Sequence, residues 1–427
     1  MTRHLVLRPL AVRCIAAAVA LTLGACTPPL PVTPTTSAPG PVTLNALFTD
    51  QARYSQTQID AMLAGYEADH PDVKVTATYV PRESLYDKIV TSAPAGTYDV
   101  VLMDVVWPAE FTEKNIVLDV TSRYPASWQQ DMLGGAYTAA QYNGKFYGVA
   151  WGPSTKFLYY NKDLVAAVGA SEADLDTWDG VLMVAQRLKD SGRVKYPLAW
   201  SWGQSEDVVC DYGQLLGAFG GQFTDASGAL AVNQPAGVQT LTWMTQTIDS
   251  GLTNPGSIAF LAPDVEKALA QGQAAFGLGW ESAFAALQDP AQSQVAGKIG
   301  VLPTPAGPTG ARPGINGGMA LAIPAKSKHP DAAWDLITYL TSQPVQNANA
   351  TGWLPNWTSS YADPAVTGQA PELFAAAPTA YAELIARPAV PNYSAISQVL
   401  QANIQSALLG GKEPQQAMDD AVAETKG

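Results

Sequence analysis

Three short apolar segments near the start of the chain decide the fold: VTLNALF at 42–48, VKVTATYV at 73–80 and YDVVLM at 98–103. Between the first two, apolar residues recur from Ile59 to Tyr66 with the spacing of one helix face. Buried strands that alternate with helices are typical of a parallel sheet that is covered on both faces. The sequence therefore predicts an α/β fold.

The same alternation returns after residue 150, which indicates a second α/β unit. We expect a helix whose apolar face carries Val181, Val184, Ala185 and Leu188, and strands at YPLAWS (196–201), AAFGLGW (274–280) and GGMALAI (317–323). The stretch from Pro371 onward is rich in alanine and poor in strand formers, so we expect helices there. A chain of 427 residues also exceeds what one hydrophobic core usually holds, which favours two domains.

The first 25 residues have the pattern of an export signal. Three arginines, at 3, 8 and 13, precede the apolar run 15–23, which is far shorter than the roughly 20 residues of a membrane-spanning helix. The run ends in Leu-Gly-Ala-Cys, which resembles a lipobox and so implies cleavage before Cys26 and lipid on its thiol. An ordinary signal peptide cut elsewhere is the alternative. The proline-rich segment TPPLPVTPTTSAPGP at 27–41 predicts an extended stalk.

The chain is acidic, because 37 Asp and Glu outnumber 24 Lys and Arg for a formal net charge of −13. The signal holds three of the arginines and no acid, so the remainder is more acidic still. A field of this sign repels phosphate backbones and anionic headgroups. We therefore expect no nucleic-acid partner, and a membrane tether only through the lipid on Cys26.

Cysteine and histidine are scarce in this sequence. Cys14 falls in the signal and Cys26 would carry lipid, which leaves Cys210 with no cysteine for an intramolecular disulfide. His70 and His329 each stand beside a proline at an expected surface turn. We therefore expect no metal site and no cofactor.

The stretch YNGKFYGVAWGPSTKFLYYNKDLV at 142–165 resembles the first crossing between the two lobes of the family 1 extracellular solute-binding proteins, the family of maltose-binding protein. Further similarity lies at GGQFTDASG (220–228), KIGVLPTPAG (298–307), INGGMALAIPAKSKHPDAAWDLITYL (315–340), GWLP (352–355) and RPAVPNYSAIS (387–397). The order and spacing of these blocks over nearly all of residues 42–425 carry the resemblance more than any single block does.

The resemblance implies a two-lobed periplasmic-binding-protein fold of type II, with the ligand in the cleft between the lobes. The implied segments are a signal peptide at 1–25, a lipidated stalk at 26–41, lobe 1 at 42–153 plus 316–352, and lobe 2 at 154–315 plus 353–427, with crossings near Ser154, Gly314 and Gly352. It also implies a substrate-binding lipoprotein, and not an enzyme. Such a protein captures a sugar or short oligosaccharide outside the cytoplasm and delivers it to the permease and ATPase of an ABC importer.

A sugar site needs carboxylates, amides or arginines for the hydroxyl groups and aromatic faces for the C–H side of the ring. Residues of these types follow strand ends in both expected lobes: Asp50, Asp104 and Trp107 in the first, and Trp202, Glu206, Trp280 and Glu281 in the second. The crossings and the C-terminal region add Ser154, Gly317, Gly318, Trp353 and Arg387. The tryptophans at 128, 178, 243 and 334 fall in helical patterns and are expected in the core.

Several of these residues have a structural alternative. Asp50 and Glu281 could serve as helix caps, and Trp280 could belong to the core between the lobes. Glycines at 317 and 318 could form only a flexible hinge. Arg387 could pair with Glu383, four residues earlier on one helix face, instead of binding hydroxyls.

The main rival function is a secreted glycoside hydrolase that uses cleft carboxylates such as Asp104, Glu206 and Glu281 as acid and nucleophile. The chain has no GxSxG, HExxH or phosphate-loop motif, and the family resemblance leaves no separate catalytic domain. A binder of peptides, amino acids or metal ions is a second rival, and the scarcity of histidine argues against metal.

Overall fold

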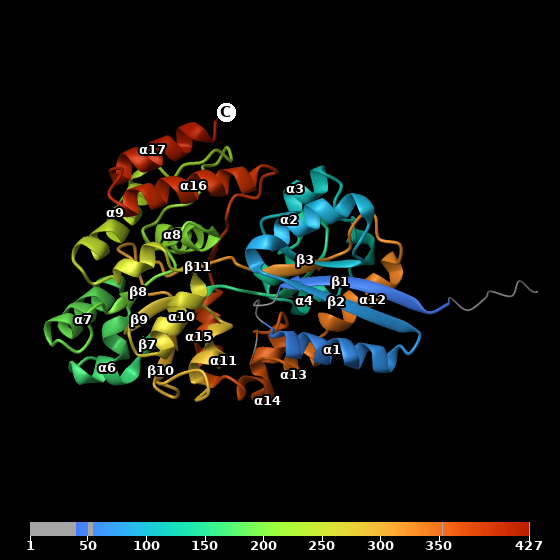
Figure 1. Cartoon of the computed structure of the whole chain (residues 1–427), viewed down its shortest axis with the longest axis horizontal. Helices are drawn as coiled ribbons and strands as arrows, with labels where there is room; N and C mark the ends of the chain where they lie inside the picture. Colours follow the sequence, from blue (N-terminus) through green and yellow to red (C-terminus); the bar gives the residue numbers. More distant parts are fainter. Residues whose placement is uncertain (1–39, 50–53, 352, 427) are drawn as a thin grey trace, which may run out of the picture. The chain divides into compact units, whose positions relative to one another are not determined.

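The computed structural model describes residues 40–49, 54–351 and 353–426. Within them two main sheets, which pack in separate hydrophobic cores, organise the chain (Figure 1). In the same ranges, no helix is both long enough and apolar enough to cross a membrane. Cys26, Asp50 and Gly352 lie outside the described residues, so the expectations for them stay predictions.

The first sheet has five strands in the order β2-β1-β3-β12-β6. Its strands are β1 (Val42–Thr49), β2 (Val73–Val80), β3 (Val100–Asp104), β6 (Val149–Gly152) and β12 (Met319–Ala322). Strands β2, β1 and β3 run parallel, and β12 is antiparallel to both of its neighbours. The three apolar segments that decide the fold are thus adjacent parallel strands, which confirms the expectation for this part of the chain.

Helices lie on both sides of this sheet (Figure 1). They are α1 (Gln56–Asp69), α2 (Arg82–Ser92), α3 (Pro108–Glu113) and α12 (Pro330–Leu340). Helix α1 begins at a capping box, in which the Ser55 hydroxyl accepts from the Gln58 N–H and the Gln58 side chain accepts from the Ser55 N–H. The four residues of its predicted apolar face are all buried.

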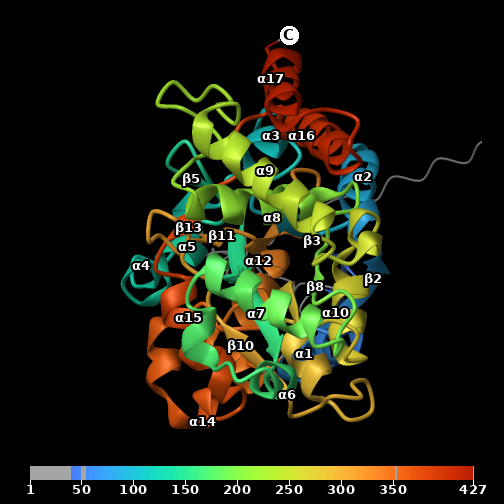
Figure 2. The ribbon, with the colours of Figure 1, turned by 90° about the vertical axis from the view of Figure 1, so that its left-hand side faces the viewer.

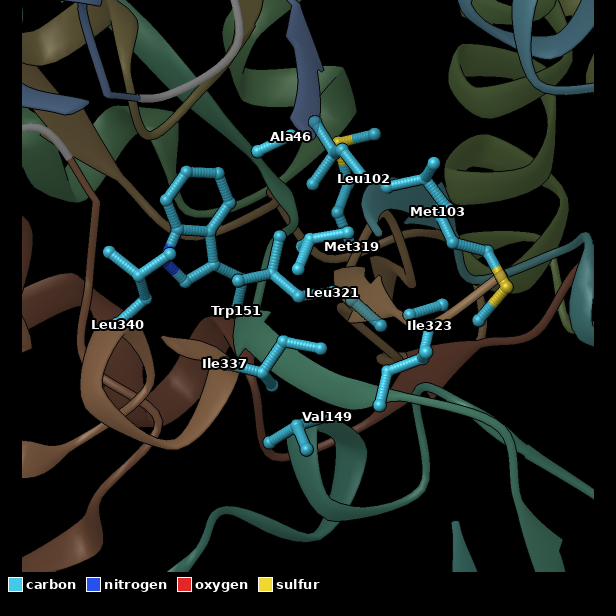
Figure 3. Packing of buried hydrophobic residues seen from close by; sticks show 14 of the residues in the cluster. Ala46, Leu102, Met103, Val149, Trp151, Met319, Leu321, Ile323, Ile337 and Leu340 are labelled. Atoms are coloured by element: carbon cyan, nitrogen blue, oxygen red, sulfur yellow. The ribbon is translucent and has the colours of Figure 1, made fainter. Parts of the chain in front are cut away.

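Trp151 of β6 is fully buried in the first core. Its ring centroid lies 5.3 Å from that of Phe48, 5.2 Å from that of Tyr54 and 6.1 Å from that of Trp353. Figure 3 shows aliphatic side chains from β3, β12 and α12 around the indole. The edge strand β6 is therefore held on the sheet by the packing of the Trp151 side chain as well as by its backbone hydrogen bonds.

The second sheet has four strands in the order β10-β7-β9-β8. They are β7 (Lys156–Asn161), β8 (Leu198–Ala199), β9 (Phe276–Trp280) and β10 (Ile299–Leu302). Alternate residues of β7 belong to different cores: Leu158 and Tyr160 join one, and Phe157 and Tyr159 join the other. Because both faces of the sheet are apolar, each must be covered.

Two groups of helices supply this cover. The core that contains Leu158 and Tyr160, which we call the second core, holds residues of α7 (Trp178–Asp190), α8 (Glu206–Ala218), α9 (Pro235–Asp249), α16 (Tyr393–Leu408) and α17 (Pro414–Glu424). The other core holds residues of α10 (Ala262–Ala270), α11 (Ala283–Gln288), α14 (Pro364–Thr367) and α15 (Pro371–Ala380). Figure 2 shows α16 and α17 beside α9, with which both are in contact. The predicted apolar face of α7 is buried, as expected.

The remaining elements are short. They are α4 (Trp128–Asp131), α5 (Gly134–Tyr137), α6 (Lys162–Ala167), α13 (Gln343–Ala348), β4 (Gln141–Tyr142), β5 (Lys145–Phe146) and 3-10 turns at 93–95, 121–123, 172–175, 255–258 and 358–362. Of the tryptophans expected in the core, Trp178 and Trp243 are buried, whereas Trp128 and Trp334 are half-buried against the first core.

Two predicted segments differ from the structure. Only Leu198–Ala199 of the segment YPLAWS is a strand. The chain then leaves the sheet, because the Trp200 N–H donates to the Ser257 hydroxyl and the Trp202 N–H donates to the Ser257 carbonyl, each at 3.1 Å. In the alanine-rich C-terminal region, β13 (Leu384–Ile385) interrupts the helices and pairs with β11 (Gly314–Ile315).

Within the described residues, two short links join the parts of the chain that form the first sheet to the parts around the second. Residues 153–155 connect β6 to β7, and residues 316–318 connect β11 to β12. The links are bonded to each other, because the Gly317 N–H donates to the Ser154 carbonyl at 2.9 Å. Strand ends from both sheets therefore meet near these links.

Trp151→Ala should lower the free energy of unfolding by about 3 to 5 kcal/mol, because it opens a cavity among rings that cannot collapse onto alanine. Chemical denaturation of the variant measures this loss. Met183→Ala is the control, since Met183 is 53% exposed and its truncation should change stability by less than about 0.5 kcal/mol. Equal stability of the two variants would contradict the packing described for Trp151.

Candidate functional site

Charged side chains gather where the strands of the first sheet end. Asp104 is the last residue of β3, and Arg82 opens α2 just after β2. The carboxyl ends of parallel strands meet at one edge of a sheet, which brings these two side chains together. Arg82 forms an ion pair with Asp104, which also accepts from the Val106 N–H at 3.2 Å.

A second arginine reaches the same carboxylate from the C-terminal region. The Arg387 guanidinium donates to Asp104 at 3.2 Å, to Glu206 at 2.7 Å and to the Asn316 carbonyl at 3.1 Å. Its side chain is only 1% exposed, so the two carboxylates compensate a buried charge. The alternative in which Arg387 and Glu383 share a helix face is wrong, because both lie outside the helices, on either side of β13.

Glu206 is the first residue of α8 and connects that helix to α16. Besides the bond from Arg387, it accepts hydrogen bonds from the hydroxyls of Tyr393 and Ser397. A carboxylate in the first turn also suits the positive end of the helix dipole. The Glu206 side chain is 26% exposed, so part of it still faces solvent.

Trp280, the last residue of β9, is half-buried. Its indole N–H donates to Asp207 at 3.1 Å, and the Lys156 ammonium lies 5.1 Å from its ring centroid. Asp207 stands next to Glu206 in the first turn of α8, and its side chain is 24% exposed. An indole surface can cover the C–H face of a sugar, and the partly exposed carboxylates beside it can accept hydrogen bonds from the sugar hydroxyls.

Lys156 at the start of β7 is fully buried and compensates the acids around Trp280. Its ammonium lies 2.5 Å from Asp211, 3.3 Å from Asp207 and 2.9 Å from the Ser201 hydroxyl. Burial alone would raise the pKa of Asp207, but Lys156 and the indole N–H of Trp280 hold that pKa below its usual value. Burial raises the pKa of Asp211 to about 6, although Lys156 opposes this rise.

Glu266 on α10 is affected by the charges of Asp207 and Lys156. Burial and then the negative charge of Asp207 raise the pKa of Glu266 to about 7, and Lys156 opposes the rise. This carboxyl group therefore titrates near neutral pH, unlike an ordinary glutamate.

Three of the predicted ligand residues lie at the first link or form hydrogen bonds to it. The Ser154 hydroxyl donates to the Glu281 carboxylate at 3.0 Å, and the Thr155 N–H donates to the same oxygen at 3.3 Å. Ser154 and Glu281 are both fully buried. The helix-cap alternative for Glu281 is not what the structure shows, because Ser282 holds the N-cap position of α11. Trp353 is buried nearby, and its indole N–H donates to the Pro153 carbonyl.

Trp202 and Trp107 have little surface to offer a ligand. Trp202 is fully buried in the second core, where its ring stacks on Trp200 at 5.6 Å, so its ring has no surface for a ligand. Trp107 is 5% exposed, and the Arg82 guanidinium lies 5.2 Å from its ring centroid. Trp202 was expected in the site because it follows a strand. After β8, however, the chain turns back into the second core, so this position does not bring Trp202 to the site.

The two predicted glycines lie on the second link. The Gly318 N–H donates to the Asn316 side chain at 3.1 Å, and the Gly318 carbonyl accepts from the Val105 N–H at 3.1 Å. Gly317 lies against the ring of Trp280. The structure thus brings Asp104, Glu206, Arg387, Trp280 and Gly317 into one region and leaves Trp202 outside it.

Sequence reasoning missed Arg82, Lys156 and Asp207. Arg82 follows a strand end, which is the same signal that singled out Asp104, and Asp207 is the neighbour of the predicted Glu206. Lys156 lies inside the stretch 142–165 that carries the resemblance, but a buried lysine gives no sequence signal of its own.

A hollow of about 340 Å³ lies elsewhere, against the first core. It is lined by Ser127, Trp128, Asp131, Thr338, Ser342, Gln343 and Trp357, and we call it the aromatic hollow. Its Asp131 carboxylate already accepts from the Ser359 N–H and hydroxyl, at 3.0 and 2.6 Å. Across the described ranges, no group of three or more His, Cys, Asp or Glu residues could hold a metal ion.

The chain belongs to the bacterial extracellular solute-binding protein family, whose model matches residues 46–347. Its fold is therefore the two-lobed periplasmic-binding-protein fold of type II, as the sequence blocks predicted. Family membership gives the protein a substrate-binding role outside the cytoplasm, in a family that is not one of enzymes.

Individual relatives agree with this assignment. A probable ABC transporter-binding protein of Deinococcus radiodurans is 29% identical over 367 residues, which cover 81% of this chain and 84% of that protein. The maltose-bound MalE3 of T. maritima is 28% identical with a TM-score of 0.83, covering 90% of this chain and 99% of that one. A ribitol complex of an Agrobacterium radiobacter ABC transporter solute-binding protein is 26% identical with a TM-score of 0.79, covering 91% and 98%.

Glu266→Gln should raise stability at neutral pH but not at pH 4. Because the folded-state pKa of Glu266 lies above its value in the unfolded chain, the wild type loses stability as pH rises from about 4.5 to 7. Glutamine does not ionise, so the variant does not lose this stability. Its free energy of unfolding should exceed that of the wild type by roughly 1 to 3 kcal/mol at pH 7 to 8. Melting temperatures from pH 4 to 8 measure the difference. Glu424→Gln, at an exposed glutamate, is the control, and parallel profiles for all three proteins would contradict the raised pKa.

Proposed function

We propose that this protein captures a neutral sugar or short oligosaccharide between the edges of its two sheets and delivers it to the permease of an ABC importer. The observation that carries the proposal is the partly exposed indole of Trp280, with the partly exposed carboxylates of Glu206 and Asp207 on the neighbouring helix end. Arg82, which is 34% exposed, adds hydrogen-bond donors from the start of α2, beside the first sheet. The ligands named for two solved relatives, maltose and ribitol, are uncharged polyhydroxylated molecules and support the same class.

The charges of this region favour an uncharged ligand. Its cations are already paired with carboxylates: Arg82 with Asp104, Arg387 with Asp104 and Glu206, and Lys156 with Asp207 and Asp211. An anionic ligand would have to compete with these carboxylates for the same cations. Sugar hydroxyls can instead donate hydrogen bonds to the carboxylates and accept them from Arg82 without breaking an ion pair.

Binding without hydrolysis is the second part of the proposal. A glycoside hydrolase needs a protonated carboxyl group and a second carboxylate, both facing the scissile bond. Two arginines and a backbone N–H occupy the oxygens of Asp104, and Glu281 is fully buried against the first link. These contacts support a role for both carboxylates in holding the site together, and direct ligand contact by Asp104 stays a prediction.

We propose the two lobes at the boundaries expected from the sequence, 42–153 plus 316–352 and 154–315 plus 353–427. The links at 153–155 and 316–318 would act as hinges, together with a third near Gly352. A ligand that contacts Trp280 in one lobe and Arg82 in the other would favour the closed state, because only that state offers both sets of contacts.

The direct test of this function is a thermal-shift screen against mono- and disaccharides, polyols, amino acids and sugar phosphates. A ligand at 100 times its dissociation constant stabilises the folded protein by about 2.7 kcal/mol, which a melting curve resolves. We expect a neutral sugar to give the largest shift. A shift with an amino acid or a phosphorylated sugar, and none with neutral sugars, would overturn the proposed ligand class.

Trp280→Ala should weaken sugar binding by about 2 to 4 kcal/mol, because it removes the aromatic surface on which the ring stacks. Calorimetric titration with the best ligand of the screen measures this loss. Trp334→Ala is a matched control, since Trp334 is a half-buried tryptophan on α12, which carries no residue of the proposed site. If the two variants bind equally well, Trp280 does not contact the ligand.

We also propose that residues 1–25 are removed, that Cys26 carries lipid and that 27–41 form a stalk. Cys26→Ala should then give a protein that is exported but no longer retained by the membrane, because an acidic body has no electrostatic affinity for anionic headgroups. Fractionation of cells, with a high-salt wash of the membranes, measures retention. Wild-type membrane retention of the variant after the wash would contradict lipidation at this cysteine.

A further inference from the structure

Gly317 lies closer to the ring of Trp280 than any other residue type could. A Cβ atom built at position 317 would fall 2.2 Å from Cζ3 and 2.5 Å from Cη2 of the indole. Both distances are shorter than any real carbon contact, so a side chain at 317 and the present ring position exclude each other. The backbone of Gly317 does not have the positive φ that favours glycine, so the ring is what requires a glycine here.

Two other groups fix the same indole. Asp207 accepts from the ring N–H at 3.1 Å, and the buried ammonium of Lys156 stands 5.1 Å from the ring centroid. Lys156 is itself held by Asp211 and Ser201. The ring is therefore restrained at its nitrogen by α8, from β7 by Lys156, and at its six-membered edge by the second link.

We infer that Gly317 is a positioning residue, which sets the pose of Trp280 without touching the ligand. This inference rests on the proposed function, in which Trp280 is the surface that the sugar ring covers. A methyl group at 317 would push the indole away from the second link, and the ring would have to leave Asp207 or Lys156. The stacking surface would then be misplaced relative to the hydroxyl-binding carboxylates.

A competing role for Gly317 is that of a hinge. Its N–H donates to the Ser154 carbonyl at 2.9 Å, which joins the two links between the sheets. If Gly317 acts as a hinge, its substitution should weaken binding whatever residue stands at position 280. If it positions the indole, its substitution should weaken binding only when Trp280 is present. A double-mutant cycle between the two positions separates these roles.

The experiment compares wild type, Gly317→Ala, Trp280→Ala and the double variant, by calorimetry with the best neutral sugar of the screen. We expect Gly317→Ala to weaken binding at least about tenfold in the wild-type background. In the Trp280→Ala background the same change should alter the dissociation constant by less than about twofold, because the ring that it displaces is gone. Equal binding by Gly317→Ala and wild type, or the same loss in both backgrounds, would overturn the inference.

Melting temperatures of the four proteins test the same contact without any ligand. Gly317→Ala should lower the melting temperature in the wild-type background and not in the Trp280→Ala background, since truncation of the ring clears the space. Equal lowering in both backgrounds, or none in either, would overturn the inference. Gly134→Ala is the control for a general glycine effect, because nothing lies within 4 Å of a Cβ added there. If wild type binds no neutral sugar, the proposed function fails while the melting data still decide the role of Gly317.

Discussion

The arrangement of the site depends on one buried charge. The guanidinium of Arg387 is almost fully enclosed and binds Asp104 at the end of β3, Glu206 at the start of α8 and the Asn316 carbonyl on the second link. Removing one partner from a buried ion pair typically costs about 3 to 5 kcal/mol, so these three segments are held in place together. The edge of the first sheet, the first turn of α8 and the second link therefore cannot move independently in this state.

A second buried cation orders the other half of the site. Lys156 neutralises Asp211 and Asp207, and Asp207 in turn accepts from the Trp280 indole. Both cations are enclosed, while parts of Glu206, Asp207 and Trp280 face solvent. Buried arginine and lysine thus hold carboxylates and an indole at the surface, where hydroxyl groups and C–H faces can be recognised with little loss of side-chain freedom.

Much of the fold could be predicted from periodicity and family blocks. The parallel strands around VTLNALF, the buried faces of α1 and α7 and the chain links near Ser154 follow from apolar spacing and from the stretch 142–165, because these signals are local. The failure at YPLAWS has a different origin. There the backbone of Trp200 and Trp202 bonds to Ser257, a residue far along the chain that no local pattern reveals.

The site was predictable only in outline. Residue type and position after a strand found Asp104, Glu206 and Trp280, since parallel strand ends converge by geometry. Burial, which the sequence does not reveal, removes other predicted residues from the surface. Trp202 also follows a strand, yet it stacks on Trp200 in the core, and Glu281 is enclosed against Ser154. Which partner an arginine such as Arg387 finds depends on tertiary contacts, so the alternative pairing with Glu383 is replaced by acids from two distant elements.

A crystal structure of the protein with its best neutral sugar is the most stringent test of ligand binding at Trp280. We expect a sugar ring against the indole of Trp280, with hydroxyl groups within hydrogen-bond distance of Asp207 or Glu206 and of Arg82. A sugar bound in the aromatic hollow, with Trp280 and these charged side chains free of ligand contacts, would contradict it.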